Sequence, residues 1–286
     1  MASPYDLDLS PPSAELLEVA RQELRETPEV RAAALIELRK LLQAATDLYF
    51  PDDDDFLIMF LRPSHFYPDS AIKLMRNVAE FKKTHSDLLK DLLPVDLKNE
   101  ILNTDVVAVL KNCDQHGRRL MIVRMGNVWD PKVISEDKVF SLLYTVHKLA
   151  ILEPKTQIKG AVVIYDFEGL GMKQVKGMSP GAAKRLLTFI QDAAPLRIKA
   201  VHFVKEPMLF SMVWTLMKPF VREKLKGRMY FHGDDMKKLH KHVDATCLPA
   251  NYGGTMPTLD YGSKEWYPTM EKHTEDVKKF NSAGFK

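Results

Sequence analysis

The stretch that most resembles a catalytic motif is residues 177–181, GMSPG, which match the G-x-S-x-G pattern around a serine nucleophile. In that pattern the residue after the serine donates its backbone N–H to the developing oxyanion. Here that residue is Pro180, which has no N–H. We therefore predict that Ser179 caps a helix whose first residue is Pro180, and that it is not a nucleophile.

Two further patterns are also incomplete. The sequence GLG at 169–171 resembles the start of a dinucleotide-binding loop, but Gln174 stands where the third glycine belongs. A group of possible zinc ligands lacks the paired spacing that zinc sites show, and we interpret its histidines as surface residues; the group is His232, His240, His242 and Cys247. The sequence thus predicts no catalytic residue, no metal and no cofactor, and a protein that is not an enzyme.

A concentration of positive charge is the remaining chemical signal. Residues 218–242 hold eight Lys or Arg against three acids, in a chain whose formal net charge is only +3. Such a patch is typical of phosphate recognition, in lipid headgroups or in nucleic acid, and a solvated surface is the alternative. Stacking aromatic residues are not interleaved with the cations, so we do not expect nucleic acid as a partner.

The composition limits where such a protein works. The chain has 286 residues, 45% of them hydrophobic, and two cysteines, which implies no disulfide framework and favours a reducing compartment. Its first residues do not resemble a signal peptide, and no apolar run reaches the length of a membrane span. We therefore expect a cytoplasmic protein whose membrane contact is peripheral and transient.

The periodicity divides the chain into three parts. Residues 1–94 are predicted to be an all-helical domain, in which the acidic run at 52–55 caps a helix rather than binding calcium. Residues 95–255 alternate strands and helices, as in an α/β domain with a mixed, largely parallel sheet. Its predicted strands are 106–110, 120–123, 161–165, 198–204 and 229–232. The tail, 256–286, is polar and is predicted to be only partly ordered.

One helix of the α/β domain is unusual. Residues 207–217, PMLFSMVWTLM, are apolar on almost every side, and the basic run 218–228 follows directly. Such a helix must be buried or meet lipid, and it is far shorter than the roughly 20 residues that span a bilayer. On the helix at 135–153, His147 lies on the apolar side, where it is either a hydrogen-bonded core residue or a polar anchor for a ligand.

Four blocks of sequence carry a resemblance to a known family. They are DDDFLIMFLRPSHF at 53–66, GAVVIYDFEGLGM at 160–172, the long block at 195–233, and LPANYGG at 248–254. Together they resemble the CRAL-TRIO family, in the animal branch that holds the tocopherol- and retinaldehyde-binding proteins and the clavesins. The resemblance covers residues 10–260. It departs from the family pattern at Ser64 and Asn251.

The resemblance implies a function and a set of residues. A helical domain would precede a lipid-binding domain, and one hydrophobic molecule, such as a retinoid, tocopherol or carotenoid, would lie between the sheet and a mobile gate, 207–217. A monomer would carry this cargo between membranes without chemistry; the alternative is a trafficking adaptor that recognises phosphoinositides. The implied cargo-binding residues are Phe140, Leu143, His147, Met172, Met178, Leu186, Phe189, Ile190, Ile198, Val201, Met208, Phe210, Val213, Trp214 and Met217. The implied phosphoinositide-binding residues are Arg62, Arg197, Lys224 and Arg228.

Overall fold

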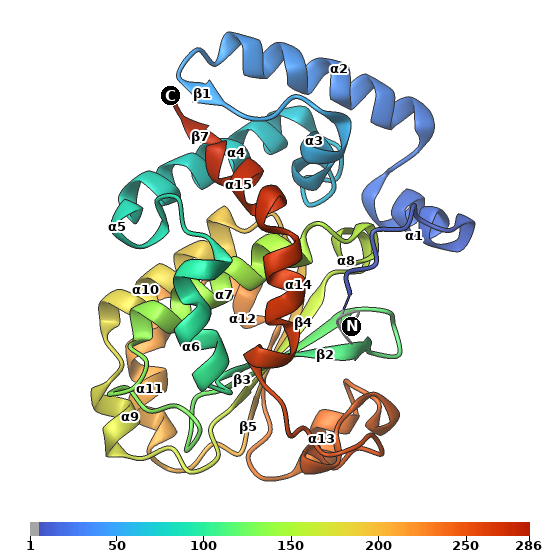
Figure 1. The fold of residues 1–286 in the computed structure, drawn as a ribbon. Helices are drawn as coiled ribbons and strands as arrows, with labels where there is room; N and C mark the ends of the chain where they lie inside the picture. Colours follow the sequence, from blue (N-terminus) through green and yellow to red (C-terminus); the bar gives the residue numbers. More distant parts are fainter. Residues whose placement is uncertain (1–5) are drawn as a thin grey trace.

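A five-stranded sheet forms the centre of the molecule. The computed structural model describes residues 6–286, and its sheet has the strand order β2-β3-β4-β5-β6 (Figure 1). Strands β2 (Val107–Cys113) and β3 (Arg119–Arg124) form an antiparallel hairpin. Strands β4 (Ala161–Asp166), β5 (Ile198–Val204) and β6 (Met229–Phe231) continue it in parallel. The predicted α/β class with a mixed, largely parallel sheet is therefore correct.

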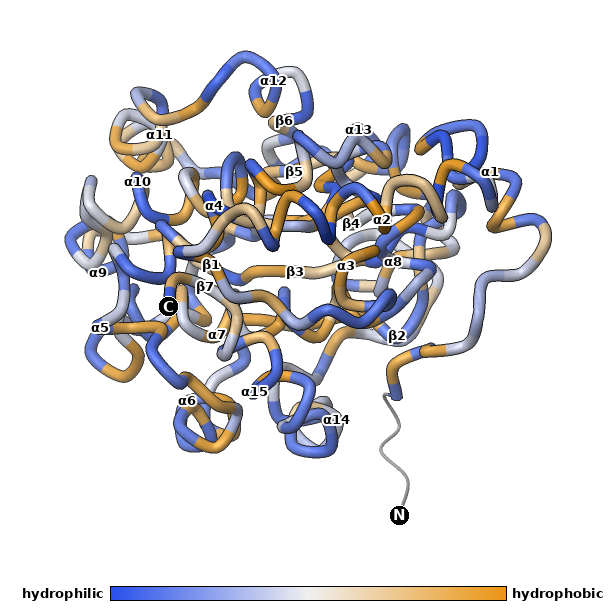
Figure 2. Tube along the Cα trace, turned by 90° about the horizontal axis from the view of Figure 1, so that it is seen from above, coloured by the Kyte–Doolittle hydropathy of each residue, from blue (hydrophilic) through white to orange (hydrophobic). Residues whose placement is uncertain are grey.

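The two faces of the sheet belong to two separate hydrophobic clusters. Side chains alternate across a strand, so Val163 and Val201 face one cluster while Val162 and Ala200 face the other. Helices α7 (Glu136–Ala150), α10 (Pro180–Thr188) and α11 (Phe210–Met217) cover the first face. The segment 236–259, with α13 (Met236–His240), covers the second. Figure 2 shows β3 as a hydrophobic segment running through the middle of the molecule.

Side-chain caps begin the first three helices of the N-terminal part. Helices α1 (Ala14–Leu24), α2 (Pro28–Ala44) and α3 (Asp54–Leu61) begin after Ser13, Thr27 and Asp53, and each of these side chains accepts a backbone N–H of the first turn. Helix α4 (Pro68–Thr84) and the shorter α5 (Ser86–Leu89) and α6 (Lys98–Asn103) follow. The acidic run at 52–55 therefore caps α3, as predicted.

The C-terminal part corrects two expectations. Residues 263–286 are ordered as a turn at Ser263–Trp266, helices α14 (Tyr267–Lys272) and α15 (Thr274–Ser282), and strand β7 (Gly284–Phe285). Strand β7 pairs antiparallel with β1 (Leu48–Tyr49), so the N-terminal part also contains a short strand where only helices were predicted. Figure 1 shows this C-terminal segment running along the N-terminal helices and down past α7.

A helical stripe that the sequence analysis overlooked explains this order. The buried side chains Trp266, Met270, Val277 and Phe280 recur at helical spacing among exposed Lys and Glu residues. They join the same hydrophobic cluster as α3, α4 and α7. The segment therefore ties the N-terminal helices to the sheet domain.

None of the helices within residues 6–286 combines the length and the apolar character that a membrane span requires.

Candidate functional site

Ser179 is a structural residue, as predicted. Its Oγ accepts a hydrogen bond from the backbone N of Ala182 at 3.1 Å, which caps α10, and donates to Glu136 Oε1 at 2.6 Å. The hydroxyl thus joins the first turns of α10 and α7.

The histidines near the C-terminal third are not all at the surface. His232 is buried, and its Nε2 lies 2.9 Å from Nδ1 of His202, a fully buried residue of β5 that the sequence analysis did not single out. The ring of His242 packs against both members of this pair. The interpretation of His232 as a surface residue is therefore wrong, because β5 and β6 are neighbours and bring the two imidazoles together. Among the described residues, no group of three or more His, Cys, Asp or Glu could hold a metal.

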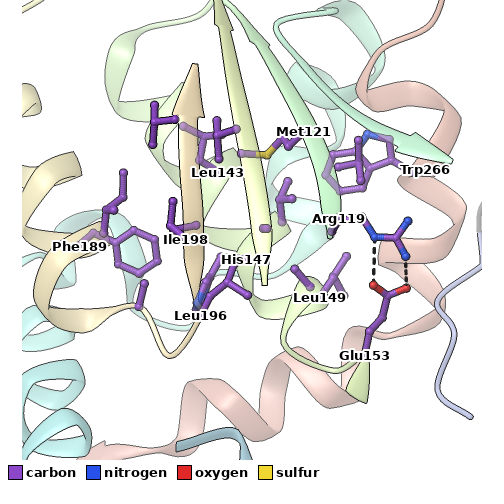
Figure 3. A pocket seen from close by; sticks show the side chains of 18 of the residues that line it. Arg119, Met121, Leu143, His147, Leu149, Glu153, Phe189, Leu196, Ile198 and Trp266 are labelled. Atoms are coloured by element: carbon purple, nitrogen blue, oxygen red, sulfur yellow. Dashed lines mark hydrogen bonds and ion pairs between the residues drawn. The ribbon is translucent and has the colours of Figure 1, made fainter. Parts of the chain in front are cut away.

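Two apolar cavities lie between the sheet and the helices on its first face. The first is bounded by β2–β5, α7, α10 and the C-terminal segment, which contributes Trp266 (Figure 3). The second lies between β3–β5, α7, α10 and the apolar helix α11. The volume that the centre of a water-sized sphere can occupy is about 90 Å³ in the first cavity and about 100 Å³ in the second. A single water needs roughly 10–15 Å³ in this measure, so both are larger than packing voids.

The two cavities are neighbours that share three lining residues: Leu143, Tyr165 and Leu186. Eleven of the fifteen cargo-binding residues implied by the resemblance line one cavity or both, namely Phe140, Leu143, His147, Met178, Leu186, Phe189, Ile190, Ile198, Val201, Val213 and Met217. These residues come from α7, β5, α11, and α10 with the residues next to it, and the fold brings them to the two neighbouring cavities.

The remaining four residues lie outside the cavities. Met172 is exposed on α9 (Met172–Lys176), and Met208 is 93% exposed in the turn before α11. Phe210 and Trp214 pack against Phe231 of β6 instead, at ring-centroid distances of 6.0 Å and 5.0 Å. Helix α11 begins only at Phe210, so the start of the predicted gate segment forms a turn.

The sequence analysis missed several residues of the first cavity. Arg119 of β3 and Glu153 form an ion pair in its wall, with Nη2 to Oε1 at 2.5 Å and Nε to Oε2 at 3.1 Å (Figure 3). Trp266 enters from the segment predicted to be only partly ordered. Nothing in the sequence around Arg119 indicates that it would line a cavity. The helical spacing of apolar residues that includes Trp266, in contrast, can be recognised in the sequence.

His147 is the most unusual polar group of the cavity wall. It is 6% exposed, and neither of its ring nitrogens has a hydrogen-bond partner among the described residues. Burial, assisted by the positive charge of Lys148, lowers the pKa of His147 to about 3. The imidazole is therefore neutral at pH 7, with one donor and one acceptor nitrogen.

Three of the four implied phosphoinositide-binding residues lie together. Arg197, Lys224 and Arg228 line one pocket with Lys199 and Arg222, beside the loop after α3. The pocket is formed by β5, its preceding turn, and α12 (Glu223–Lys226) with its flanking residues. The local excess of cations therefore faces a concave site.

Arg62 is not part of this group. Its guanidinium is buried and bound to Glu26 through Nε at 2.9 Å and Nη2 at 2.8 Å, while Nη1 donates to Gln157 Oε1. Ser64, where the family pattern has a second arginine, is buried as well. A buried guanidinium that is paired in this way is not available to a lipid headgroup, so Arg62 instead joins the end of α3 to the connection between α1 and α2 and to α8 (Pro154–Lys159).

One carboxylate reaches the basic pocket from the N-terminal helices. Glu23 of α1 accepts hydrogen bonds on Oε2 from Arg197 Nη2 at 2.8 Å and from Lys199 Nζ at 2.9 Å. Burial acts to raise the pKa of Glu23, but the two cations outweigh it and the net shift is downward. Asp192 similarly pairs with Arg222. The chain itself therefore supplies counter-charges to part of the basic pocket.

Comparisons with known proteins identify the family of the chain. The model of the CRAL/TRIO domain matches residues 103–254. The chain is 32% identical to the alpha-tocopherol transfer protein-like protein of Mus musculus, over 97% of this chain and 83% of that one. It is 31% identical to the protein of the same name from Homo sapiens, over 93% and 77%. It is 29% identical to clavesin-1 of Rattus norvegicus, over 90% and 73%. The chain belongs to the CRAL/TRIO domain family.

Proposed function

We propose that this protein binds one hydrophobic molecule in the two neighbouring cavities and carries it between membranes without chemical change. The observation that carries the proposal is the pair of apolar cavities between the sheet and helices α7, α10 and α11. Pockets for small hydrophobic molecules are concave, mostly apolar and furnished with few polar groups. The names of the relatives, which include a tocopherol transfer protein-like protein, support the same role.

A cargo of retinoid, tocopherol or carotenoid size needs more room than either cavity offers alone. Leu143, Tyr165 and Leu186 form the boundary between them. Leucine side chains change rotamer readily where a neighbouring cavity leaves space. Rotation of Leu143 and Leu186 would join the two spaces into one elongated site along the sheet.

The gate, residues 207–217, is suited to meet a membrane. Only Phe210 and Val213 of α11 are buried, whereas Met208 and Met212 are exposed. Methionine adapts its shape to irregular apolar surroundings, including acyl chains. A helix that closes a cavity on one side and exposes methionines on the other can exchange its protein contacts for lipid contacts when it opens.

The basic pocket would bring the gate to the membrane. Phosphoinositide headgroups are the ligands we propose for Arg197, Lys224 and Arg228; Lys224 and Arg228 belong to the basic run that directly follows the gate. A ligand that binds the open form more tightly than the closed form shifts the population toward opening. In this proposal the protein is a cytoplasmic monomer that associates with membranes transiently.

A cavity-filling substitution tests cargo binding. Leu186→Trp places a larger side chain where both cavities meet, and we expect it to lower the affinity for any cargo at least about tenfold, because overpacking leaves no room for it. Lys184→Trp, exposed on the same helix, is the matched control and should bind normally. Native mass spectrometry and a vesicle-to-vesicle transfer assay provide the measurements. Wild-type protein that never carries a hydrophobic molecule would contradict the proposal.

A charge substitution tests the basic pocket. Lys224→Ala combined with Arg228→Ala should weaken binding to phosphoinositide vesicles about 10- to 30-fold, since each cation near an anionic surface contributes about 1 kcal/mol. Glu23→Gln should act in the opposite direction, because it frees Arg197 and Lys199. Vesicle sedimentation measures both variants, and cargo affinity in solution should stay unchanged.

The same variants distinguish the second candidate function. A phosphoinositide-reading trafficking adaptor is favoured by one observation, namely that the cations of the basic pocket line neither cavity; they are Arg197, Lys199, Arg222, Lys224 and Arg228. If Leu186→Trp leaves the protein's cellular role intact while the Lys224 and Arg228 substitutions abolish it, the adaptor function holds and the carrier function does not.

A further inference from the structure

The two cavities together follow strand β4 from its beginning to its end. Ala161 and Val163 line the first cavity, and Tyr165 lines both. Phe167, which directly follows the strand, lines the second. Alternate residues of a strand share one face and each residue adds about 3.3 Å, so these four side chains mark a site about 20 Å long. A cargo molecule that occupies both cavities therefore lies along β4.

The gate and the N-terminal segment, residues 6–12, lie at opposite ends of this site. Three residues of the gate, Val213, Leu216 and Met217, line the second cavity, and no residue of the gate lines the first. Leu7 lines the first cavity and not the second, and it packs against the same hydrophobic cluster as α7. Figure 1 shows the N-terminal segment running from α1 past α8 toward the β2–β3 hairpin. Leu7 therefore bounds the end of the site that is far from the gate.

Contacts on both sides of Leu7 hold it over the first cavity. The backbone N of Asp8 donates to Glu153 Oε1 at 3.1 Å, and Glu153, in the cavity wall, is 1% exposed. On the other side, the carboxylate of Asp6 pairs with Lys272 Nζ of α14 at 3.0 Å, and both side chains are exposed. An exposed ion pair contributes little to stability, whereas a hydrogen bond to a buried carboxylate contributes more. The bond to Glu153 is therefore the main anchor of Leu7.

We propose that Leu7 closes the cargo site at the end opposite the gate and thereby sets the greatest length of hydrophobic chain that the site accepts. The inference rests on the proposed cargo-binding function and adds a specificity-determining residue to it. A longer chain would have to displace Leu7, and with it the hydrogen bond between Asp8 and Glu153. Because the limit is set by the length of the site, it holds for either orientation of the cargo.

A series of 1-alkanols of increasing chain length tests the proposal. Their affinities are measured by displacement of a fluorescent fatty alcohol from the full-length protein. The affinity of the wild type should rise with each added CH₂ up to a cut-off length and then fall, because longer chains meet Leu7. Leu7→Ala should move the cut-off to longer chains. An alkanol two carbons beyond the wild-type cut-off should then bind the variant about tenfold more tightly than the wild type. Leu7→Trp should move the cut-off to shorter chains.

Substitutions beside Leu7 test its anchor and provide the controls. Asp8→Pro removes the N–H that Glu153 accepts, and should shift the cut-off in the same direction as Leu7→Ala. Asp8→Ala keeps this N–H and should bind like the wild type. Leu9→Ala changes a residue of the same segment that is 47% exposed and lines neither cavity, and it should leave the cut-off unchanged.

The outcomes separate this inference from the function on which it rests. If no alkanol of any length binds to the wild type, the cargo-binding function itself fails. If alkanols bind but the cut-off is the same in the wild type, Leu7→Ala and Leu7→Trp, the length limit lies elsewhere and the role of Leu7 is overturned.

Discussion

Phe280→Ala is expected to lower the free energy of unfolding by about 3–5 kcal/mol, the usual result of removing a buried phenylalanine ring. Phe280 is almost fully buried, and its ring lies 5.9 Å from Phe56 and 6.4 Å from Phe60 of α3, measured between centroids. It also lies 6.5 Å from the ring of His147 on α7. One side chain therefore joins the C-terminal segment, the N-terminal helices and the wall of the first cavity.

Neighbouring polar contacts make this position more sensitive. Lys148 is buried beside it and donates from Nζ to Asn281 Oδ1 at 2.5 Å. Lys82 Nζ donates to the carbonyl oxygens of Phe280 at 3.2 Å and Asn281 at 2.7 Å. Loosening α15 would leave the buried ammonium group of Lys148 and the partly buried one of Lys82 with fewer acceptors, which is unfavourable.

Urea denaturation followed by circular dichroism measures the effect. Lys278→Ala, exposed on the same helix, is the matched control and should change the unfolding free energy by less than about 0.5 kcal/mol. A loss of less than about 1 kcal/mol for Phe280→Ala would mean that the C-terminal segment contributes little to the folded state in solution.

Acidification from pH 7 to pH 5 is expected to remove about 6 kcal/mol of stability through three buried histidines. Burial is the main reason why all three have lowered pKa values. The pKa is about 3 for His147, about 3 for His202 and about 4 for His232. In the unfolded chain these groups have a pKa of about 6.5. Between pH 6.5 and pH 4 the unfolded chain therefore binds protons that the folded protein does not, so stability falls as pH falls, by about 2 kcal/mol per histidine at pH 5.

The charges around these histidines act in the same direction. Lys148 lies next to His147, and Arg118 lies near His202, so a proton on either ring would meet further positive charge. Asp235 opposes this effect at His232. The burial-lowered pKa of Lys148, about 7, affects stability mainly at higher pH, because below pH 7 this group is charged in the folded protein too.

Unfolding midpoints in urea at pH 7, 6 and 5 provide the measurement. His147→Leu should lose only about 4 kcal/mol over this range, because one of the three groups is gone. It should also be more stable than the wild type at pH 7, since two unpartnered nitrogens are replaced by apolar atoms. His116→Ala, exposed in the β2–β3 turn, is the control. Equal pH dependence in His147→Leu and wild type would show that His147 is not held neutral by burial.

The sequence alone determined the local structure. Side chains that accept the N–H groups of their own helix, such as Ser13, Asp53 and Ser179, act within a single turn, and their spacing is sufficient to predict them. The strands of the sheet and the apolar character of the gate follow from periodicity in the same way. The family resemblance added the expectation of a cargo-binding cavity. Eleven of the fifteen cargo-binding residues that it implies line the two cavities.

Only the tertiary structure decided which partners the buried polar groups have. Hydrogen bonds to Glu26 and Gln157 hold Arg62 away from the basic pocket. His232 is buried against His202, which lies on the adjacent strand. Trp266 reaches the cavity because the C-terminal stripe packs against the same core as α7. Periodicity predicts which face of an element is buried, but the partner, and with it the charge state and the available hydrogen bonds, is set by segments that are distant in the sequence.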